Sequence, residues 1–444
     1  MNLPDGFAFG VGTSAFQIEG ARDLDGKGPS IWDTFGDAGH VPDLDLLGPD
    51  HYHRWEEDVR LLADLGVDAY RLSIAWSRIL PDGTGEVNRA GIDFYARLID
   101  ALLEAGVTPW ITLYHWDLPQ ALQDRGGWPD RRTVDAFVEY AGVVADAFGD
   151  RVTDWITQNE PWVASFVGHM EGVFAPGLTD WRAAIAAAHH ILLAHGRAVP
   201  VLRDRVPGAN VGIALDCRPA WPASDREEDV RAQLHFDGFR NRWFFDPVFG
   251  LGYPEDMVGA YADLGRMPEA LVWKGDMEAI AAPIDFLGLN YYTSLRVGAG
   301  SEETEETGQP EGPDQPDGFT EMGWPITPSG LTYYLRHLHR TYGPESIVVT
   351  ENGASFSDGP GPDGRIRDER RIDYLDQHLD AVEAAVELGV PMGGYFLWSF
   401  LDNLEWTSGY AQRFGLVHVD HETGERTPKD SFHWYRDVIA ATRG

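Results

Sequence analysis

Short, largely apolar runs recur along the chain, separated by stretches long enough to hold a helix. Runs of this length, apolar throughout rather than at every second position, are typical of strands that are covered on both faces. The predicted strands span residues 7–12, 69–74, 108–113, 154–157, 211–215, 286–290, 347–350 and 394–398. The pattern therefore predicts eight buried strands joined by long connections.

Between these runs, apolar residues return every three or four positions, which is the period of a helix with one buried face. The clearest predicted helices span residues 55–65, 90–104, 133–148, 183–199 and 370–388, and Pro200 is expected to end the fourth of them. A strand-then-helix alternation repeated eight times predicts the α/β class and a (β/α)8 TIM barrel with elaborated βα loops. A doubly wound open sheet is the competing fold, but no GxGxxG or Walker-type loop follows an early strand.

The chain shows no internal boundary. Its 444 residues would allow three domains of about 150 residues, yet no Ser/Gly-rich or Pro-rich linker divides them, so we expect one barrel domain over residues 1–444. Residues 301–321 carry eight acidic side chains and no cation. This segment predicts a solvated loop after the sixth strand, with a passive acidic loop favoured over a lid at the barrel mouth.

Charge changes what the protein can bind. Lys and Arg number 35 against 71 Asp and Glu, which gives a formal net charge of −36. This excess argues against a nucleic-acid partner, because affinity for phosphate backbones comes from clustered cations. A hydrophobic content of 43% argues against wholesale disorder. Only three cations are lysines, a bias that adaptation to high salt and codon bias explain equally well.

Targeting and metal signals are absent from the sequence. The start, MNLPDGFAFG, has no basic segment followed by an apolar one, and no run of about 18 apolar residues occurs, which predicts a cytoplasmic protein without membrane contact. Cys217 is the single cysteine, which excludes an internal disulfide and a cysteine-cluster metal site; we expect it to be buried. The histidines are dispersed, and those of His51-Tyr52-His53 are interpreted as structural, so neither a metal nor a cofactor is predicted.

Two glutamates stand at the ends of predicted strands. Glu160 follows the fourth strand in the string NEPW, and Glu351 follows the seventh strand in the string TENG. Because the carboxyl ends of barrel strands open at one mouth, both side chains are expected to face each other there. Paired carboxyls suit glycoside hydrolysis, in which one acts on the anomeric carbon and the other protonates the leaving oxygen. Either glutamate alone could equally be a capping or salt-bridged residue.

Aromatic and amide side chains crowd the same strand ends. Sugars present C–H faces that pack on aromatic rings, and hydroxyls that need polar partners. The residues of this kind are Gln17, His115, Trp116, Asn159, Asn290, Tyr291, Tyr292, Trp398, Glu405 and Trp406. Together with the two glutamates they indicate a carbohydrate site, although most of the 16 tryptophans are expected to be structural.

Eight strings of the sequence are similar to motifs of one known family. In chain order they are QIEG (17–20), KGPSIWD (27–33), YRLSIAWSR (70–78), LYHWDLP (113–119), NEPW (159–162), NYYT (290–293), TENG (350–353) and LDNLEW (401–406). They resemble family 1 glycoside hydrolases, the β-glucosidase family. The resemblance runs from residue 5 to residue 436 and keeps the family's order.

The resemblance implies a single (β/α)8 barrel and hydrolysis with net retention of anomeric configuration. By motif, Glu351 resembles the family's nucleophile and Glu160 its acid/base. Arg71 and Tyr292 are similar to the residues that contact the nucleophile and hold it ionised and oriented. The residues that resemble the family's substrate-binding set are Gln17, His115, Trp116, Asn159, Asn290, Trp398, Glu405, Trp406 and Phe414, with Trp324 on the aglycone side.

Elementary electrostatics agrees with these roles. Two carboxyls about 5 Å apart are not both charged easily, so one of them keeps a proton at neutral pH. Arg71 beside Glu351 would favour an ionised nucleophile and leave Glu160 protonated. Once Glu351 is esterified by the sugar its charge disappears, so the pKa of Glu160 should fall and the same group can then act as a base toward water.

Three features refine the substrate class. A carboxylate such as Glu405 near O4 and O6 suits a neutral sugar and would repel a 6-phosphate, and the loop after it has no lysine, which argues against a phosphoglycosidase. Glu160 occupies the position at which thioglucosidases of the family carry Gln, which argues against that branch. Gln158 replaces the usual apolar residue before the NEPW string, and we expect it to change local hydrogen bonding only.

The leading hypothesis is a retaining exo-β-glucosidase. It would release terminal β-D-glucosyl residues from small β-glucosides and cello-oligosaccharides, with side activity on β-fucosides and β-galactosides. One alternative is a transglycosylase that passes the same glycosyl intermediate to an alcohol acceptor; the other is a non-catalytic sugar-binding protein. The expected partner is therefore a small β-glucoside or oligosaccharide substrate, and the sequence indicates no oligomeric state.

Overall fold

The barrel strands come from the whole length of the chain. The computed structural model describes residues 1–300 and 318–443. Eight parallel strands close into a barrel in the order β1-β10-β9-β7-β5-β4-β3-β2, which confirms the predicted fold. Their bounds are β1 (Ala8–Gly12), β2 (Ala69–Ser73), β3 (Thr108–Tyr114), β4 (Asp154–Asn159), β5 (Asn210–Cys217), β7 (Phe286–Tyr291), β9 (Ile347–Asn352) and β10 (Met392–Trp398).

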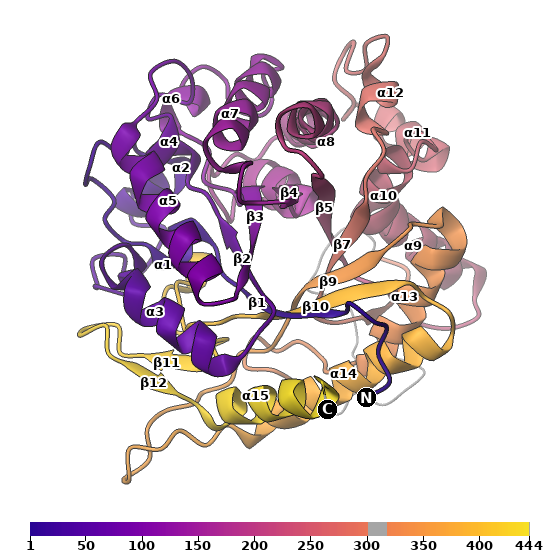
Figure 1. Ribbon diagram of the computed structural model, residues 1–444. Helices are drawn as coiled ribbons and strands as arrows, with labels where there is room; N and C mark the ends of the chain where they lie inside the picture. The colour runs from indigo at the N-terminus through magenta and orange to yellow at the C-terminus, as the bar shows by residue number, and fades with distance from the viewer. Residues whose placement is uncertain (301–317, 444) are drawn as a thin grey trace.

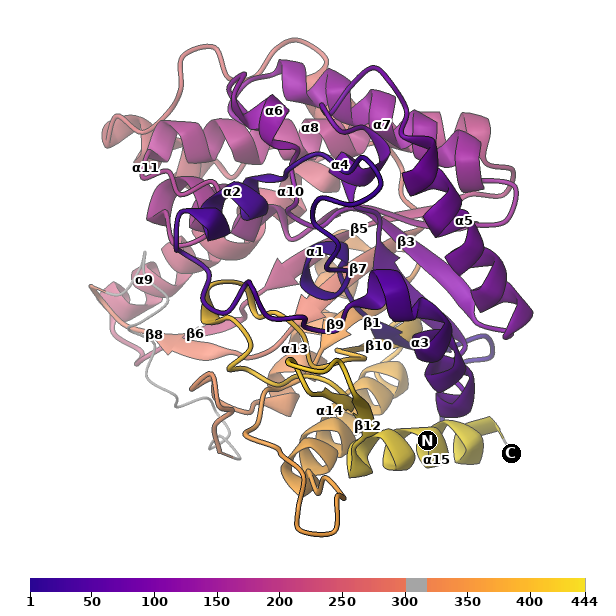
Figure 2. The ribbon, with the colours of Figure 1, turned by 90° about the vertical axis from the view of Figure 1, so that its left-hand side faces the viewer.

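A layer of helices surrounds the barrel, and Figures 1 and 2 show the two chain ends close together beside α15. The principal outer helices are α3 (His51–Leu65), α5 (Arg89–Glu104), α7 (Arg132–Phe148), α8 (Trp181–Arg205), α10 (Trp243–Val248), α13 (Pro328–Tyr342), α14 (Glu369–Glu387) and α15 (Asp430–Arg443). The strand-to-helix connections hold α1 (Ala15–Ile18), α2 (Ile31–Asp37), α4 (Trp76–Ile79), α6 (Gln120–Gln123), α9 (Glu227–Asp237), α11 (Glu255–Asp263) and α12 (Asp276–Ile280).

Large side chains fill the inside of the barrel. The Trp110 ring lies between Phe286 and Phe396, with ring centroids 5.0 Å from each. The strands can approach these rings only where side chains are small: a Cβ on Gly10 would stand 2.3 Å from the Phe396 ring. The barrel is therefore a packed core rather than a pore, which leaves its carboxyl-end mouth as the place for a ligand.

The prediction that Pro200 ends the fourth helix is wrong, because α8 continues to Arg205. Val199 and Leu202, on either side of the proline, are buried, and their packing outweighs the one hydrogen bond that proline cannot donate. Among the described residues α8 is also the one helix long and apolar enough to cross a membrane. Because 83% of its most apolar window is buried inside the protein, it is explained as a core helix.

The connections on the carboxyl side of the strands carry small elements that the sequence pattern did not predict. They are the π-helices η1 (Val163–Glu171) and η2 (Gly238–Arg242), the 3-10 helix η4 (Trp406–Ser408), and the strand pairs β6 (Ala220–Pro222) with β8 (Leu295–Val297) and β11 (Val417–Val419) with β12 (Arg426–Pro428). The acidic segment 301–321 was predicted to be a solvated loop. Its residues 301–317 lie outside the described part of the chain.

Helix α8 packs so closely on α12 that one glycine is required. A Cβ on Gly196 would lie 1.9 Å from the backbone oxygen of Ala279, whereas a Cβ on Gly259, in the exposed face of α11, would meet nothing within 4 Å. We predict that Gly196→Ala lowers the free energy of unfolding by about 1–3 kcal/mol or more. Gly259→Ala should instead raise it by about 0.5–1 kcal/mol, because alanine restricts the unfolded chain.

Urea titration of both variants measures this difference. Equal stability of the two variants would contradict the close packing of α8 on α12.

Candidate active site

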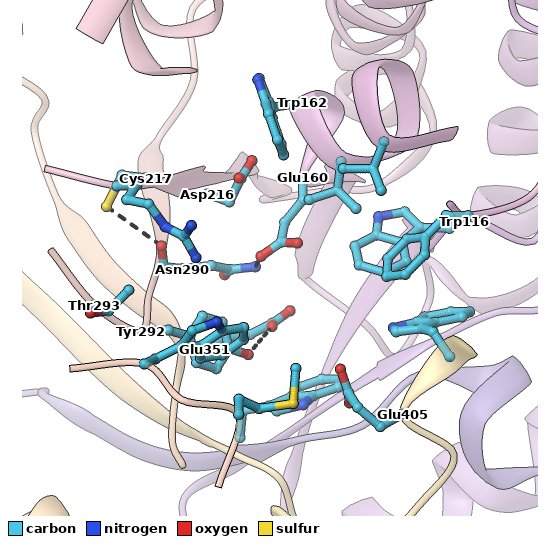
Figure 3. Close-up of a pocket in the computed structure, with 18 of the residues that line it drawn as sticks. Trp116, Glu160, Trp162, Asp216, Cys217, Asn290, Tyr292, Thr293, Glu351 and Glu405 are labelled. Atoms are coloured by element: carbon cyan, nitrogen blue, oxygen red, sulfur yellow. Dashed lines mark hydrogen bonds between the residues drawn. The ribbon is translucent and has the colours of Figure 1, made fainter. Parts of the chain in front are cut away.

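A cavity opens at the carboxyl ends of the barrel strands, and Figure 3 shows the side chains that line it. Most of the residues singled out from the sequence line this cavity: His115, Trp116, Glu160, Asn290, Tyr292, Trp324, Glu351, Trp398, Glu405, Trp406 and Phe414. Gln17, Arg71 and Asn159 lie behind this lining and hydrogen-bond to it or to its supporting loop. The barrel thus gathers residues from seven of the eight strings into one place.

Glu351 is held by two donors. It lies within β9 rather than after it, because pairing with Asn290 on β7 extends the strand beyond the predicted end. Arg71 Nη1 donates to Glu351 Oε1 at 2.5 Å, and Tyr292 Oη donates to Oε2 at 2.6 Å. Burial raises the pKa of Glu351, and the Arg71 charge together with these hydrogen bonds counters part of that increase.

Glu160 stands directly after β4 in an unusual backbone conformation. Its φ of +48° lies in the left-handed region, and its backbone N–H donates to Ala214 O on β5 at 2.9 Å. Asn290 Nδ2 donates to Glu160 Oε1 at 2.7 Å. Burial and the negative charges of Asp216 and Glu351 raise the pKa of Glu160 well above its ordinary value.

The two carboxyls therefore have different environments. Glu351 faces a permanent cation and a phenol, whereas Glu160 faces an amide donor and two negative charges. When the pair shares one proton, Glu160 is the group that keeps it, and Glu351 is the group that ionises. This asymmetry is what an acid and a nucleophile acting in one step require.

Asn159 connects the two halves of the site. Its Oδ1 accepts from Arg71 Nη2 at 2.6 Å and from Asn290 Nδ2 at 3.0 Å, so its Nδ2 is left to donate to His115 Nε2 at 3.2 Å. His115 must then accept at Nε2 and carry its proton on Nδ1. Burial and the nearby Arg71 charge lower the pKa of His115 well below its usual value, which keeps the ring neutral.

Aromatic rings form part of the cavity wall. His115 stacks on Trp398 with centroids 5.6 Å apart, and Trp116 packs on Trp406 at 4.6 Å. Trp116 and Trp406 both adopt positive φ, as Glu160 does, so three of the eight described non-glycine residues in this region of φ belong to the site. Non-glycine residues hold such angles only where the surrounding packing imposes them, and this occurs often at functional sites.

The loop before η4 presents Glu405 to the cavity. Burial and the charge of Glu351 raise the pKa of Glu405 to about 8. Gln17 braces this loop from behind, because its Nε2 donates to Leu404 O at 2.7 Å and to Asn403 Oδ1 at 3.2 Å. Gln17 is therefore close to the site without lining the main cavity.

Several lining residues were not found from the sequence. The apolar ones are Trp162, Val163, Val167, Val173, Phe174 and Met322, and the polar ones are Glu171, Asp216, Arg218, Arg240 and Thr293. Cys217, buried as predicted, also lines the cavity, and its Sγ donates to Asn290 O at 3.5 Å. Only Trp162, inside the NEPW string, and Thr293, inside the NYYT string, carried a usable signal; Asp216 lies near the end of β5, and the others come from the connections after the strands. No group of three His, Cys, Asp or Glu residues that could hold a metal ion occurs in the described part of the chain.

Comparisons with known proteins identify the family of the chain. The chain is 46% identical to β-glucosidase A of Thermotoga maritima over 98% of its own length and 97% of that protein, and 42% identical to a bifunctional β-D-glucosidase/β-D-fucosidase of Bifidobacterium breve over 99% and 98%. The solved family 1 β-glucosidase of Thermotoga maritima in complex with isofagomine lactam superposes with a TM-score of 0.92 at 46% identity, covering 99% of this chain and 98% of that one. The model of glycosyl hydrolase family 1 matches residues 1–443, and the chain belongs to this family.

Proposed function

We propose that this protein is a retaining β-glucosidase that removes terminal β-D-glucosyl residues from small β-glucosides by double displacement. The observation that carries the proposal is the unequal pair of carboxyls in one cavity. Arg71 and Tyr292 favour the ionised form of Glu351. Burial and neighbouring negative charge favour the protonated form of Glu160. The β-glucosidase names of its relatives support the same activity.

In the first displacement, a carboxylate oxygen of Glu351 attacks the anomeric carbon. The bond from that carbon to the aglycone oxygen breaks, and Glu160 delivers its proton to this oxygen as the aglycone leaves. Arg71 and Tyr292 keep the attacking carboxylate ionised and fixed in orientation. The product of this step is a glucosyl ester of Glu351.

In the second displacement, water takes the place of the aglycone. The ester has removed the charge of Glu351, so one of the two causes of like-charge repulsion on Glu160 is gone and its pKa falls. Glu160 then accepts a proton from water as the water oxygen attacks the anomeric carbon and the ester bond breaks. Two inversions at the same carbon give net retention.

The sugar side of the cavity suits a neutral hexose. His115 and Glu405 offer polar groups for hydroxyls, and Trp398 offers an aromatic face. The bifunctional relative from Bifidobacterium breve supports side activity on β-fucosides, and we propose β-galactosides as a further minor substrate. Cello-oligosaccharides taken up into the cytoplasm would be suitable natural substrates.

The same intermediate would serve transglycosylation. Apolar residues such as Val163, Val167 and Met322 line the cavity together with Trp324, so the aglycone side can hold an alcohol acceptor. We propose hydrolysis as the main reaction because the relatives are named as β-glucosidases. Product analysis with added alcohol distinguishes the two, since free glucose should dominate over alkyl glucoside.

Removal of the nucleophile should abolish turnover. We predict that Glu351→Ala lowers kcat/KM for a chromogenic aryl β-glucoside by about 10^4-fold or more, because no covalent intermediate can form. Glu387→Ala, on the exposed end of α14, should leave the rate unchanged. Equal rates for wild type and Glu351→Ala would remove the enzyme hypothesis and favour a sugar-binding protein.

Removal of the acid/base should depend on the leaving group. Glu160→Ala should retain activity best on glucosides whose aglycone leaves without protonation, and added azide should restore turnover by attacking the ester in place of water. NMR of the product is expected to show β-glucosyl azide, which means retention. An α-glucosyl azide would mean that Glu160 and Glu351 have exchanged roles.

The acidic composition supports a further proposal, tolerance of high salt. A net charge of −36 makes the folded protein repel itself, and salt screens this repulsion between exposed groups. We predict that the melting temperature and the activity are maintained or rise as NaCl increases from low concentration to the molar range. Loss of both above moderate salt would contradict this proposal and leave codon bias as the explanation.

A further inference from the structure

The cavity contains a buried ion pair that the proposed mechanism does not use. Asp216, at the carboxyl end of β5, pairs with Arg240 of η2, and both side chains are largely buried. The Arg240 guanidinium also lies over the Trp162 ring, 3.7 Å from its centroid. Trp162 follows Glu160 by two residues, so this pair is attached to the segment that carries the acid/base.

Strand pairing places Asp216 beside Glu160. The Glu160 backbone N–H donates to Ala214 O on β5, and Asp216 is two residues further along that strand, on the same face as Ala214. On its other side, β5 pairs with β7 so that Asp216 is in register with Asn290, the residue that donates to Glu160 Oε1. Figure 3 shows Asp216 and Asn290 beside Glu160.

The π-helix η2 fixes the end of β5. Asn241, next to Arg240, accepts from Arg218 N at 3.0 Å and donates to Arg218 O at 3.2 Å. These two hydrogen bonds and the Asp216–Arg240 contact join Asp216, in β5, and Arg218, just beyond its end, to η2. The position of the Asp216 carboxylate is therefore set by packed elements rather than by a free side chain.

We propose that the Asp216–Arg240 pair is a positioning element that keeps the acid/base Glu160 protonated at neutral pH. The inference rests on the proposed function, because it assigns a task to groups around its general acid. Asp216 provides a fixed negative charge beside Glu160, and Arg240 holds that carboxylate in place and limits the size of its effect. Arg240 also ties the pair to Trp162 and so to the backbone of Glu160.

The charges that face Glu160 come from every neighbouring element. Glu351 on β9 and Asp216 on β5 are negative, and Arg240 on η2 is positive. Burial raises the pKa of Tyr292 and that of Cys217 well above their ordinary values, so both remain neutral. The other titratable residues that line the cavity are His115, Glu171, Arg218 and Glu405. Asp216 precedes Glu351 among the charges that raise the pKa of Glu160, so its removal should be measurable.

The test is the pH dependence of kcat/KM. Glu160 must be protonated to act as an acid, so activity falls as pH rises through its pKa, which is the basic limb of the profile. Asp216→Asn removes a negative charge, makes the protonated form less favourable and should move this limb down by about 1 pH unit. Arg240→Gln removes the positive charge that pairs with Asp216 and should move the limb upward, whereas Arg240→Lys should keep it close to wild type.

A second ion pair provides the control. Asp276 is as buried as Asp216 and pairs with the partly exposed Arg131, and neither residue lines the cavity. Asp276→Asn should leave the basic limb in place even if it lowers the melting temperature. The basic limb is expected to shift in opposite directions in Asp216→Asn and Arg240→Gln. A general loss of packing would not shift it in opposite directions in the two variants.

An unchanged basic limb in Asp216→Asn, or a downward shift in Arg240→Gln, would overturn the inference. If Asp216→Asn does not fold, the direction of the shift in Arg240→Gln decides. The proposed function is tested separately: if wild type lacks β-glucosidase activity, or if Glu160→Ala keeps the basic limb on an activated aryl glucoside, that function fails first. If Glu160→Ala changes the basic limb of the bell-shaped profile and Asp216→Asn does not, the inference about Asp216 is refuted while the proposed function stands.

Discussion

The contact between Arg71 and Glu351 is the interaction on which the site depends. A fully buried guanidinium needs buried partners, and Arg71 has four: Glu351, the backbone oxygen of Thr350, Asn159 and Thr112. Without this cation, burial would favour the neutral form of Glu351 as it does that of Glu160. The cation breaks the equivalence of the two carboxyls, and the chemistry follows from that difference. The same contact joins β2 to β9 across the barrel mouth.

The barrel makes this arrangement rigid. Its interior is filled by Trp110, Phe286 and Phe396, so the strands cannot shift to relieve an unfavourable charge at the mouth. Asn159 connects Arg71 to Asn290 and His115 through hydrogen bonds of 2.6–3.2 Å and so fixes their relative positions. The positive φ angles of Glu160, Trp116 and Trp406 are sustained by this packing. Side chains placed in this way need little rearrangement when a sugar binds.

Sequence periodicity predicted the eight barrel strands because each is a continuous apolar run with a helix after it. It failed at Pro200, where the buried residues Val199 and Leu202 keep α8 intact against a local signal to stop. It also ended the seventh strand before Glu351. A charged residue is not expected inside a buried strand unless its partner, here Arg71, is known. In both cases a long-range contact outweighed a local preference.

The site was predictable to the extent that it lies on strand ends. Glu160, Glu351, Asn290 and Trp398 follow or close apolar runs, so the barrel model alone brought them together. Asp216, Arg240 and Val167 belong to the cavity as well, but two of them lie in π-helices whose spacing carries no signature. The third, Asp216, ends a strand without any neighbouring motif to mark it as functional.

The central claim is that Glu351, and not Glu160, forms the bond to the sugar. Mass spectrometry after incubation with a 2-deoxy-2-fluoro-β-glucoside that has an activated leaving group tests it, because fluorine at C2 slows both displacements while the activated leaving group keeps the first one fast, so the ester accumulates. We expect the protein to gain the mass of one fluoroglucosyl group, and peptide mapping should locate this group on Glu351. An adduct on Glu160, or no adduct while turnover of the unfluorinated glucoside continues, would contradict it.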